Sequence, residues 1–187
     1  MKWVIAFAFI AGASCTSCTT NHDAQGSGSV TQVTDPADAI DQKLMIALSQ
    51  AKNFHHKAKV YMSDGNTDAA IASVREILSI RFPNAPEADD VRNDARALLA
   101  RLLVGKGQLD EAMNVVMEGL SSPRESFFVA NLYTVKGEIH EARATQMAAA
   151  PDADKAKVSA ERHAAIDAFT KSNDIDKKLQ DQLMGSP

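Results

Sequence analysis

Residues 54–74, FHHKAKVYMSDGNTDAAIASV, carry small and bulky residues at spacings that predict two helices joined by a tight turn. Ala58 is small enough to let another helix approach, and Tyr61, three positions later, fills the space beside it. Gly65 then ends the first helix, because glycine enters a tight turn at little cost. Ala70, five positions after the glycine, marks the closest packing point on the second helix. The stretch therefore predicts a pair of antiparallel helices.

The same arrangement recurs twice further along the chain, as Ala100-x-x-Leu103-x-x-x-Gly107-x-x-x-x-Ala112 and as Ala130-x-x-Tyr133-x-x-x-Gly137-x-x-x-x-Ala142. A single helix pair of this kind cannot bury its apolar face alone, so the copies must stack on one another. We therefore expect an all-α fold over residues 36–184. It would be a short α-solenoid of about three to four antiparallel helix pairs. The alternative is an unrelated alanine-rich helical bundle, which would use the same small residues.

Apolar residues at helical spacing predict helices along most of the chain from Asp35-Pro36 onward. The expected helices cover residues 37–62, 67–80, 87–104, 109–120, 127–136, 139–149 and 151–171, with a short last helix capped by Asn173-Asp174. In this scheme Gly137 forms a turn, and Pro123 occupies the first position of a helix. No run alternates apolar and polar residues for long enough to predict a strand.

The repeated unit resembles the tetratricopeptide repeat (TPR), a helix–turn–helix of about 34 residues. Phe54 stands where that family has its first aromatic residue, and Val74 replaces its later phenylalanine. A fourth half-repeat is visible at Ala165 and Phe169, which stand at the family's alanine and phenylalanine positions. The resemblance covers residues 51–176. It implies a scaffold for protein–protein interaction, with a groove lined by the first helix of each pair.

By position in that resemblance, the groove would present Lys52, His55 and Lys59 from the first pair, Ala97 and Arg101 from the second, and Arg124, Phe127 and Asn131 from the third. On a chain with a formal net charge of -4, these residues make a locally basic groove with one exposed aromatic side chain. We expect the groove to favour acidic or carboxylate-ended segments of a protein partner, with Phe127 supplying apolar contact. The alternative is a solvated basic face with no binding role.

The first residues of the chain have the layout of an exported protein. Residues 1–14 combine one lysine, an apolar run and small residues, which predicts a signal peptide too short to span a membrane. The ending Gly12-Ala13-Ser14-Cys15 resembles the lipobox of bacterial lipoproteins, which implies a lipid on Cys15. Cys18 is a second candidate, and an ordinary cleaved signal is the alternative. Residues 15–35 are polar and rich in glycine and serine, which predicts a flexible linker.

Together these features predict an exported, lipid-anchored scaffold in the bacterial cell envelope. Thr16 follows the proposed lipid cysteine, and the sorting rule of enterobacterial lipoproteins then favours the periplasmic side of the outer membrane. The resemblance is to small lipoproteins of this repeat class, some of which help to assemble outer-membrane or pilus complexes. That is the function the resemblance implies for this chain.

The sequence contains no motif that predicts catalysis, a cofactor or a metal site. His55 and His56 are neighbours on a predicted helix and point about 100° apart, so they cannot chelate one ion together. No His-Glu-x-x-His or Gly-x-Ser-x-Gly motif occurs. The mild negative charge argues against non-specific nucleic-acid binding, which requires a basic surface. We therefore expect no enzyme, cofactor or nucleic-acid partner. The alternative function is a helical envelope enzyme or a small-ligand-binding protein.

Overall fold

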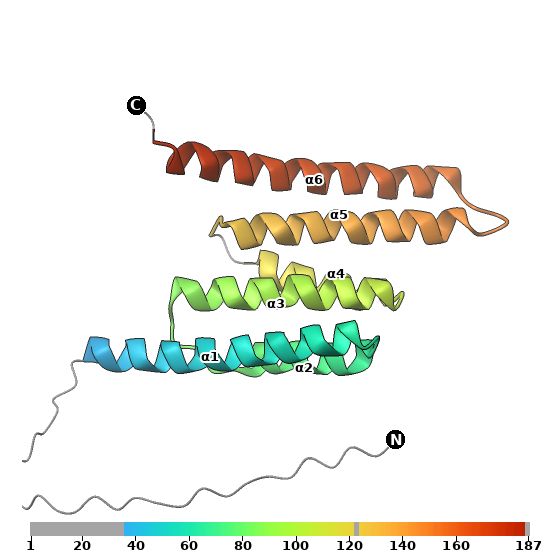
Figure 1. The fold of residues 1–187 in the computed structure, drawn as a ribbon. Helices are drawn as coiled ribbons and strands as arrows, with labels where there is room; N and C mark the ends of the chain where they lie inside the picture. The colour runs from blue at the N-terminus through green and yellow to red at the C-terminus, as the bar shows by residue number, and fades with distance from the viewer. Residues whose placement is uncertain (1–35, 122–123, 186–187) are drawn as a thin grey trace, which may run out of the picture. The chain divides into compact units, whose positions relative to one another are not determined.

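A computed structural model describes residues 36–121 and 124–185, with side chains from Gln42 onward. This part of the chain contains α-helices and no strand (Figure 1). The helices are α1 (Pro36–Ser63), α2 (Thr67–Ser79), α3 (Pro86–Gly105), α4 (Leu109–Leu120), α5 (Phe127–Ala148) and α6 (Lys155–Leu183). The predicted signal peptide, Cys15 and the linker up to residue 35 lie outside the described residues.

The six described helices form three antiparallel pairs, α1 with α2, α3 with α4, and α5 with α6 (Figure 1). The pairs pack in chain order: α3 contacts both helices of the first pair, and α5 contacts both helices of the second. Each pair thus buries its apolar face against the next, as stacking repeats require. The predicted all-α solenoid of helix pairs is confirmed.

The first pair has the geometry that its sequence predicts. Ala58 and Ala70 are fully buried, which allows α1 and α2 to approach closely. Gly65 joins the helices with a φ of 72°, a left-handed conformation that favours glycine. Asn66 then caps α2, because its side-chain oxygen accepts a hydrogen bond of 3.1 Å from the Ala69 backbone N–H.

The second pair repeats these features. Ala100 and Ala112 are fully buried, and so is Leu103 between them. Gly107 ends the turn with a φ of 73°. The backbone N–H of Gln108 donates to the carbonyl oxygen of Leu103 at 2.9 Å, which satisfies one of the free carbonyls at the end of α3.

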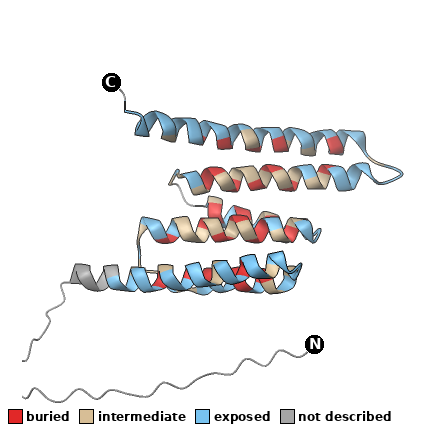
Figure 2. Ribbon diagram, viewed as in Figure 1, coloured by how far each residue is buried: buried red, intermediate tan, exposed pale blue. Residues whose placement is uncertain are grey.

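The main core runs through the first two pairs and continues into α5. Leu132, Val135 and Ile139 of α5 are fully buried and pack against the apolar residues of α3 and α4. Gly119 in α4 permits this contact, since a Cβ there would lie 2.4 Å from the Leu132 Cδ1 atom. Buried residues accordingly lie mainly on the four helices between α1 and α6 in the chain, while α1 and α6 are mainly exposed (Figure 2).

The predicted turn at Gly137 is wrong, because α5 is one continuous helix through that position. The apolar period does not break there: Val135 and Ile139, on either side of the glycine, both enter the core. Gly137 is buried, and its missing side chain leaves room for the ring of Phe169 in α6. The glycine therefore marks a close contact between helices and not the end of one.

The predicted boundary between residues 171 and 174 is also wrong. Helix α6 runs unbroken from Lys155, and Asp154 caps it by accepting hydrogen bonds from two backbone N–H groups. Ser172 and Ile175 continue the buried stripe of α6 against α5, which holds Asp174 inside the helix. The half-repeat recognised at Ala165 and Phe169 is thus the second helix of the third pair.

Helix α5 also begins later than the sequence indicates. Pro123, predicted at its first position, lies outside the described residues. The helix starts at Phe127, and the Ser126 hydroxyl oxygen accepts a hydrogen bond of 3.3 Å from the Val129 N–H. Ser126 is therefore the capping residue.

Candidate partner-binding face

The first helices of the three pairs, α1, α3 and α5, bring most of the predicted binding residues to their surface. We call this surface the first-helix face and define it by Lys52, His55, Lys59, Arg101, Arg124, Phe127 and Asn131, the residues predicted from the sequence. Ala97, also expected there, is buried in the core of α3 instead. The remaining residues differ sharply in what their side chains contact.

Lys52 and Lys59 lie two turns apart on α1, which places them on one side of the helix. Both side chains are exposed, and neither forms an ion pair with any residue between 36 and 185 that the structure describes. Their ammonium groups face solvent and keep their full capacity to bind an anionic group. These two lysines are the available cations of the face.

His55 lies between the two lysines and turns toward α3. Its Nδ1 atom is 3.8 Å from the Asp94 Oδ2 atom, with both side chains partly exposed. A shallow hollow of about 210 Å³ opens here and is lined by Leu48, Ala51, Lys52, His55, Ile77, Val91, Asp94 and Ala95. The hollow combines an apolar floor with a lysine and a carboxylate at its edge. It can accept an apolar side chain of a partner.

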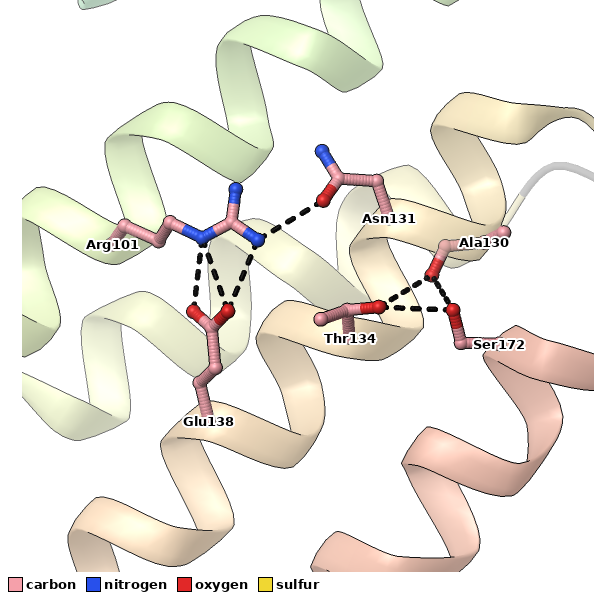
Figure 3. A network of polar contacts seen from close by, with 6 residues as sticks. All are labelled: Arg101, Ala130, Asn131, Thr134, Glu138 and Ser172. Atoms are coloured by element: carbon pink, nitrogen blue, oxygen red, sulfur yellow. Dashed lines mark hydrogen bonds and ion pairs between the residues drawn. The ribbon is translucent and has the colours of Figure 1, made fainter.

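Arg101 is held by α5 and is not a free cation (Figure 3). Its Nε atom donates to Glu138 Oε2 at 2.9 Å, and its Nη2 atom donates to Glu138 Oε1 at 3.0 Å. Nη2 also donates to the Asn131 Oδ1 atom at 3.0 Å. The structure thus brings the predicted Arg101 and Asn131 together, but they bind each other and Glu138, which links α3 to α5.

Arg124 is likewise engaged within the chain. Its guanidinium donates to the Asp90 carboxylate at the start of α3, and this hydrogen bond is the main cause that raises the pKa of Arg124 above its usual value. The pair ties the segment before α5 to the second helix pair. Arg124 therefore acts first as a structural link.

Phe127 matches its predicted role as an exposed aromatic residue. Its side chain is 64% exposed at the first position of α5. The ring packs edge-on against Phe128, with centroids 5.8 Å apart and planes at 81°. That contact orients the ring without covering it. Exposed aromatic side chains of this kind supply much of the binding energy in protein interfaces.

The sequence reasoning missed the three carboxylates of this face, Asp90, Asp94 and Glu138. The signal was present for two of them: Asp94 precedes Arg101 by two helical turns, and Glu138 follows Asn131 by the same interval. That spacing places each carboxylate on the same side of its helix as a predicted binding residue. The face is consequently basic along α1 only and nearly neutral along α3 and α5.

No other chemistry is evident in the part of the chain that the structure describes. Among these residues, no group of three or more His, Cys, Asp or Glu is placed to hold a metal ion. None of the described helices has the length and apolar content needed to cross a bilayer. The first-helix face is therefore the candidate site that the described residues offer, and its shape and exposed side chains suit the binding of a chain segment.

Comparison with known proteins identifies residues 51–84 as a tetratricopeptide repeat. The match begins in α1 at Ala51, includes the Gly65 turn and all of α2, and contains Lys52, His55 and Lys59. It confirms the resemblance to the tetratricopeptide repeat, directly for the first helix pair. No curated protein and no solved structure matches the chain.

Proposed function

We propose that this chain, which contains a tetratricopeptide repeat at residues 51–84, is a scaffold that binds an acidic segment of a protein partner along the first-helix face. Tetratricopeptide repeats typically bind proteins. Three stacked helix pairs supply a continuous surface for such a segment. The partner would be recognised by its carboxylates and by one or two apolar side chains.

The observation that carries this proposal is the free state of Lys52 and Lys59 beside the hollow that His55 and Asp94 border. An apolar side chain of the partner fits the hollow, and a carboxylate near it reaches a lysine. Further along the face, exposed Phe127 offers a second apolar contact. Acidic side chains at the partner's ends would steer it toward α1 and away from the neutralised α3.

The location we propose is the periplasmic side of the outer membrane, with a lipid on Cys15 as the anchor. Support comes from residues 1–16 alone: the apolar leader, the lipobox-like ending and Thr16 after the cysteine. Several acyl chains would hold the helical domain at the membrane stably, because each buried methylene contributes about 0.8 kcal/mol. In that position the scaffold would serve the assembly of an outer-membrane or pilus complex.

Site-specific photo-crosslinking in intact cells tests the binding face. We expect Phe127→p-benzoylphenylalanine, which leaves Lys52 and Lys59 of α1 in place, to crosslink a partner protein. Ile166→p-benzoylphenylalanine is the matched control, since Ile166 of α6 is 58% exposed and Phe127 is 64% exposed. An equal yield of crosslinked partner from position 166 would contradict the proposed face. So would a crosslink that persists in the double variant Lys52→Glu with Lys59→Glu.

A separate experiment tests the anchor. In fractionated cells we expect the chain in the membrane fraction and Cys15→Ser in the soluble periplasmic fraction. Cys18→Ser is the control and should behave like the unaltered chain. If Cys18→Ser alone releases the protein, the lipid is on Cys18. If both variants stay in the membrane fraction, the protein is not anchored through either cysteine.

A further inference from the structure

The charge of α1 differs from that of the chain as a whole. Between Gln42 and Ser63 it carries four lysines, Lys43, Lys52, Lys57 and Lys59, and no aspartate or glutamate. The first six residues of the helix add two acidic residues, Asp38 and Asp41. The whole chain has a formal net charge of -4. None of these four lysines forms an ion pair with another described residue. This helix is therefore the cationic part of an acidic protein.

The outward side of α1 also exposes apolar side chains in an uncharged strip. Met45, Ile46 and Val60 are 66%, 61% and 60% exposed, respectively. They lie opposite the buried stripe that includes Ala51 and Ala58. The residues between them on this side, such as Ser49 and Asn53, are polar but uncharged. No described helix covers the strip, since α1 packs only on α2 and α3.

The lysines border this strip on both sides. An α-helix has 3.6 residues per turn, so Lys52 and Lys59 lie about 80–100° from Val60 around the axis of α1, in one direction. Lys57 and Lys43 are rotated about 60–100° in the other direction. The ammonium of Lys57 lies 5.8 Å from the centre of the Tyr61 ring, which supports its side chain along the helix. Exposed apolar side chains with lysines at both edges are a pattern found in helices that lie at a membrane surface.

We infer that the outward side of α1 binds the surface of a bilayer that contains anionic phospholipids. Met45, Ile46 and Val60 would enter the boundary between headgroups and acyl chains, and the lysines on both edges would extend their stems and reach lipid phosphates. An acidic segment on the first-helix face would engage only Lys52 and Lys59 and would compete with the bilayer for them. It would leave Lys43 and Lys57 on the other edge without an anion, because one extended segment cannot contact both edges of a helix at once. A flat anionic surface contacts both. This inference requires no lipid on Cys15.

The test is a local fluorescence measurement on the full chain. Cys15→Ser and Cys18→Ser remove the native thiols, and Val60→Cys carries an environment-sensitive label. The control carries the label at Ile166→Cys, because Val60 and Ile166 are 60% and 58% exposed. Vesicles contain phosphatidylglycerol with phosphatidylcholine, or phosphatidylcholine alone. We expect a blue shift at position 60 with anionic vesicles only, and none at position 166. Added salt should weaken the shift by screening.

Two pairs of charge variants complete the test. Lys43→Gln with Lys57→Gln should weaken partition onto anionic vesicles by about 30-fold, since each lysine near such a surface contributes a factor of about five. Lys155→Gln with Lys177→Gln removes two exposed lysines from α6 and should leave partition within about twofold, because α6 contacts neither α1 nor the two helices packed on α1. Circular dichroism checks that both variants are folded.

Each remaining outcome would overturn the inference. Equal shifts at positions 60 and 166, or equal shifts with neutral vesicles, would mean that α1 is not the binding surface or that charge does not matter. If the chain attached to the vesicles through apolar residues 4–11 alone, the label at position 60 would stay in water. Its fluorescence would then show no blue shift. A label response to a deca-glutamate peptide, with none to anionic vesicles, would assign this side of α1 to acidic proteins instead.

Discussion

The ring of Phe169 in α6 lies directly against the backbone of Gly137 in α5. A Cβ atom at position 137 would be 2.4 Å from the Phe169 Cε1 atom and 2.7 Å from Cδ1 and Cζ, closer than real contacts allow. The glycine thus sets the spacing of the third helix pair. It does so from the middle of a helix, where glycine is otherwise unfavourable.

We predict that Gly137→Ala destabilises the protein although alanine is the better helix former. The new methyl group must displace the Phe169 ring, and overpacking of this kind costs about 1–3 kcal/mol. The higher helix propensity of alanine offsets about 1 kcal/mol of that cost. Urea unfolding followed by circular dichroism measures the free energy of unfolding.

Gly105→Ala is the matched control, because a Cβ there meets nothing within 4 Å. It should leave the free energy of unfolding unchanged or raise it by up to about 1 kcal/mol. In the Gly137→Ala background, Phe169→Leu should recover part of the lost stability, since it removes the clashing ring atoms. A Gly137→Ala protein as stable as the unaltered chain would show that the two helices do not meet in this way.

Ser172 makes the second contact that fixes this pair, and its removal should be measurable. Its hydroxyl donates to the Ala130 carbonyl oxygen at 2.8 Å and lies 2.9 Å from the Thr134 hydroxyl oxygen (Figure 3). We expect Ser172→Ala to lower the free energy of unfolding by about 1 kcal/mol, the usual net value of such a bond. Thr170→Ala, at an exposed position of α6, should change it by less than about 0.5 kcal/mol. Equal effects of the two substitutions would count against the bond.

Binding of an acidic peptide should distinguish the free lysines from the paired arginine. Lys59→Gln should weaken binding of a glutamate-rich peptide. The double variant Arg101→Gln with Glu138→Gln removes a neutral ion pair without freeing either charge, so it should barely change binding. Glu138→Gln should strengthen binding by up to about fivefold, since it releases a partly exposed cation worth at most about 1 kcal/mol. Fluorescence anisotropy of the labelled peptide measures all three. A larger loss with the double variant than with Lys59→Gln would reverse this assignment.

Asp154 should make the stability of α6 depend on pH. Hydrogen bonds from the backbone N–H groups of Lys157 and Ala156 lower the pKa of the Asp154 carboxyl below its ordinary value. Because the folded pKa lies below the unfolded one, the carboxylate stabilises the fold above the unfolded pKa of about 3.9, and this contribution is lost as pH falls through the folded pKa. Asp154→Asn keeps a capping oxygen but does not titrate.

The measurement is thermal unfolding of both proteins between about pH 6 and pH 2. We expect the unaltered chain to be more stable than Asp154→Asn near neutral pH, and this difference to shrink in acid. Asp152→Asn removes a charge from the same loop without touching the cap and controls for net charge. A difference that stays constant with pH would mean that the carboxylate does not cap the helix.

The first two helix pairs could be predicted because their signal is local. Gly65 and Gly107 each adopt a positive φ at a turn, with alanines at fixed distances that pack across it. Gly137 carries the same sequence signal for a different reason, the approach of Phe169 from another helix. Further turn-forming residues accompany the first two glycines, namely Asp64 and Asn66 beside Gly65 and Gly105 before Gly107. Gly137 has none, so the alanine spacing alone misplaced the third pair.

The candidate face was predictable in position but not in charge. Helical spacing correctly placed Lys52, Lys59 and Phe127 at the surface of the first helices. The pairing of Arg101 with Glu138 depends on how α3 and α5 pack, because the two residues lie on different helices. A count of cations on one face therefore overestimated its basic character wherever a neighbouring helix supplied a carboxylate.

Helix α6 contacts α5 and no other described helix, although it is the longest helix among the described residues. Releasing it would leave the core of the first two pairs intact, so α6 should detach before the rest of the protein unfolds. Its backbone amides would then exchange with deuterium sooner than those of α3 under native conditions. The last helix of this array is thus a separable unit, and a protein bound to its exposed side could hold it closed or draw it away.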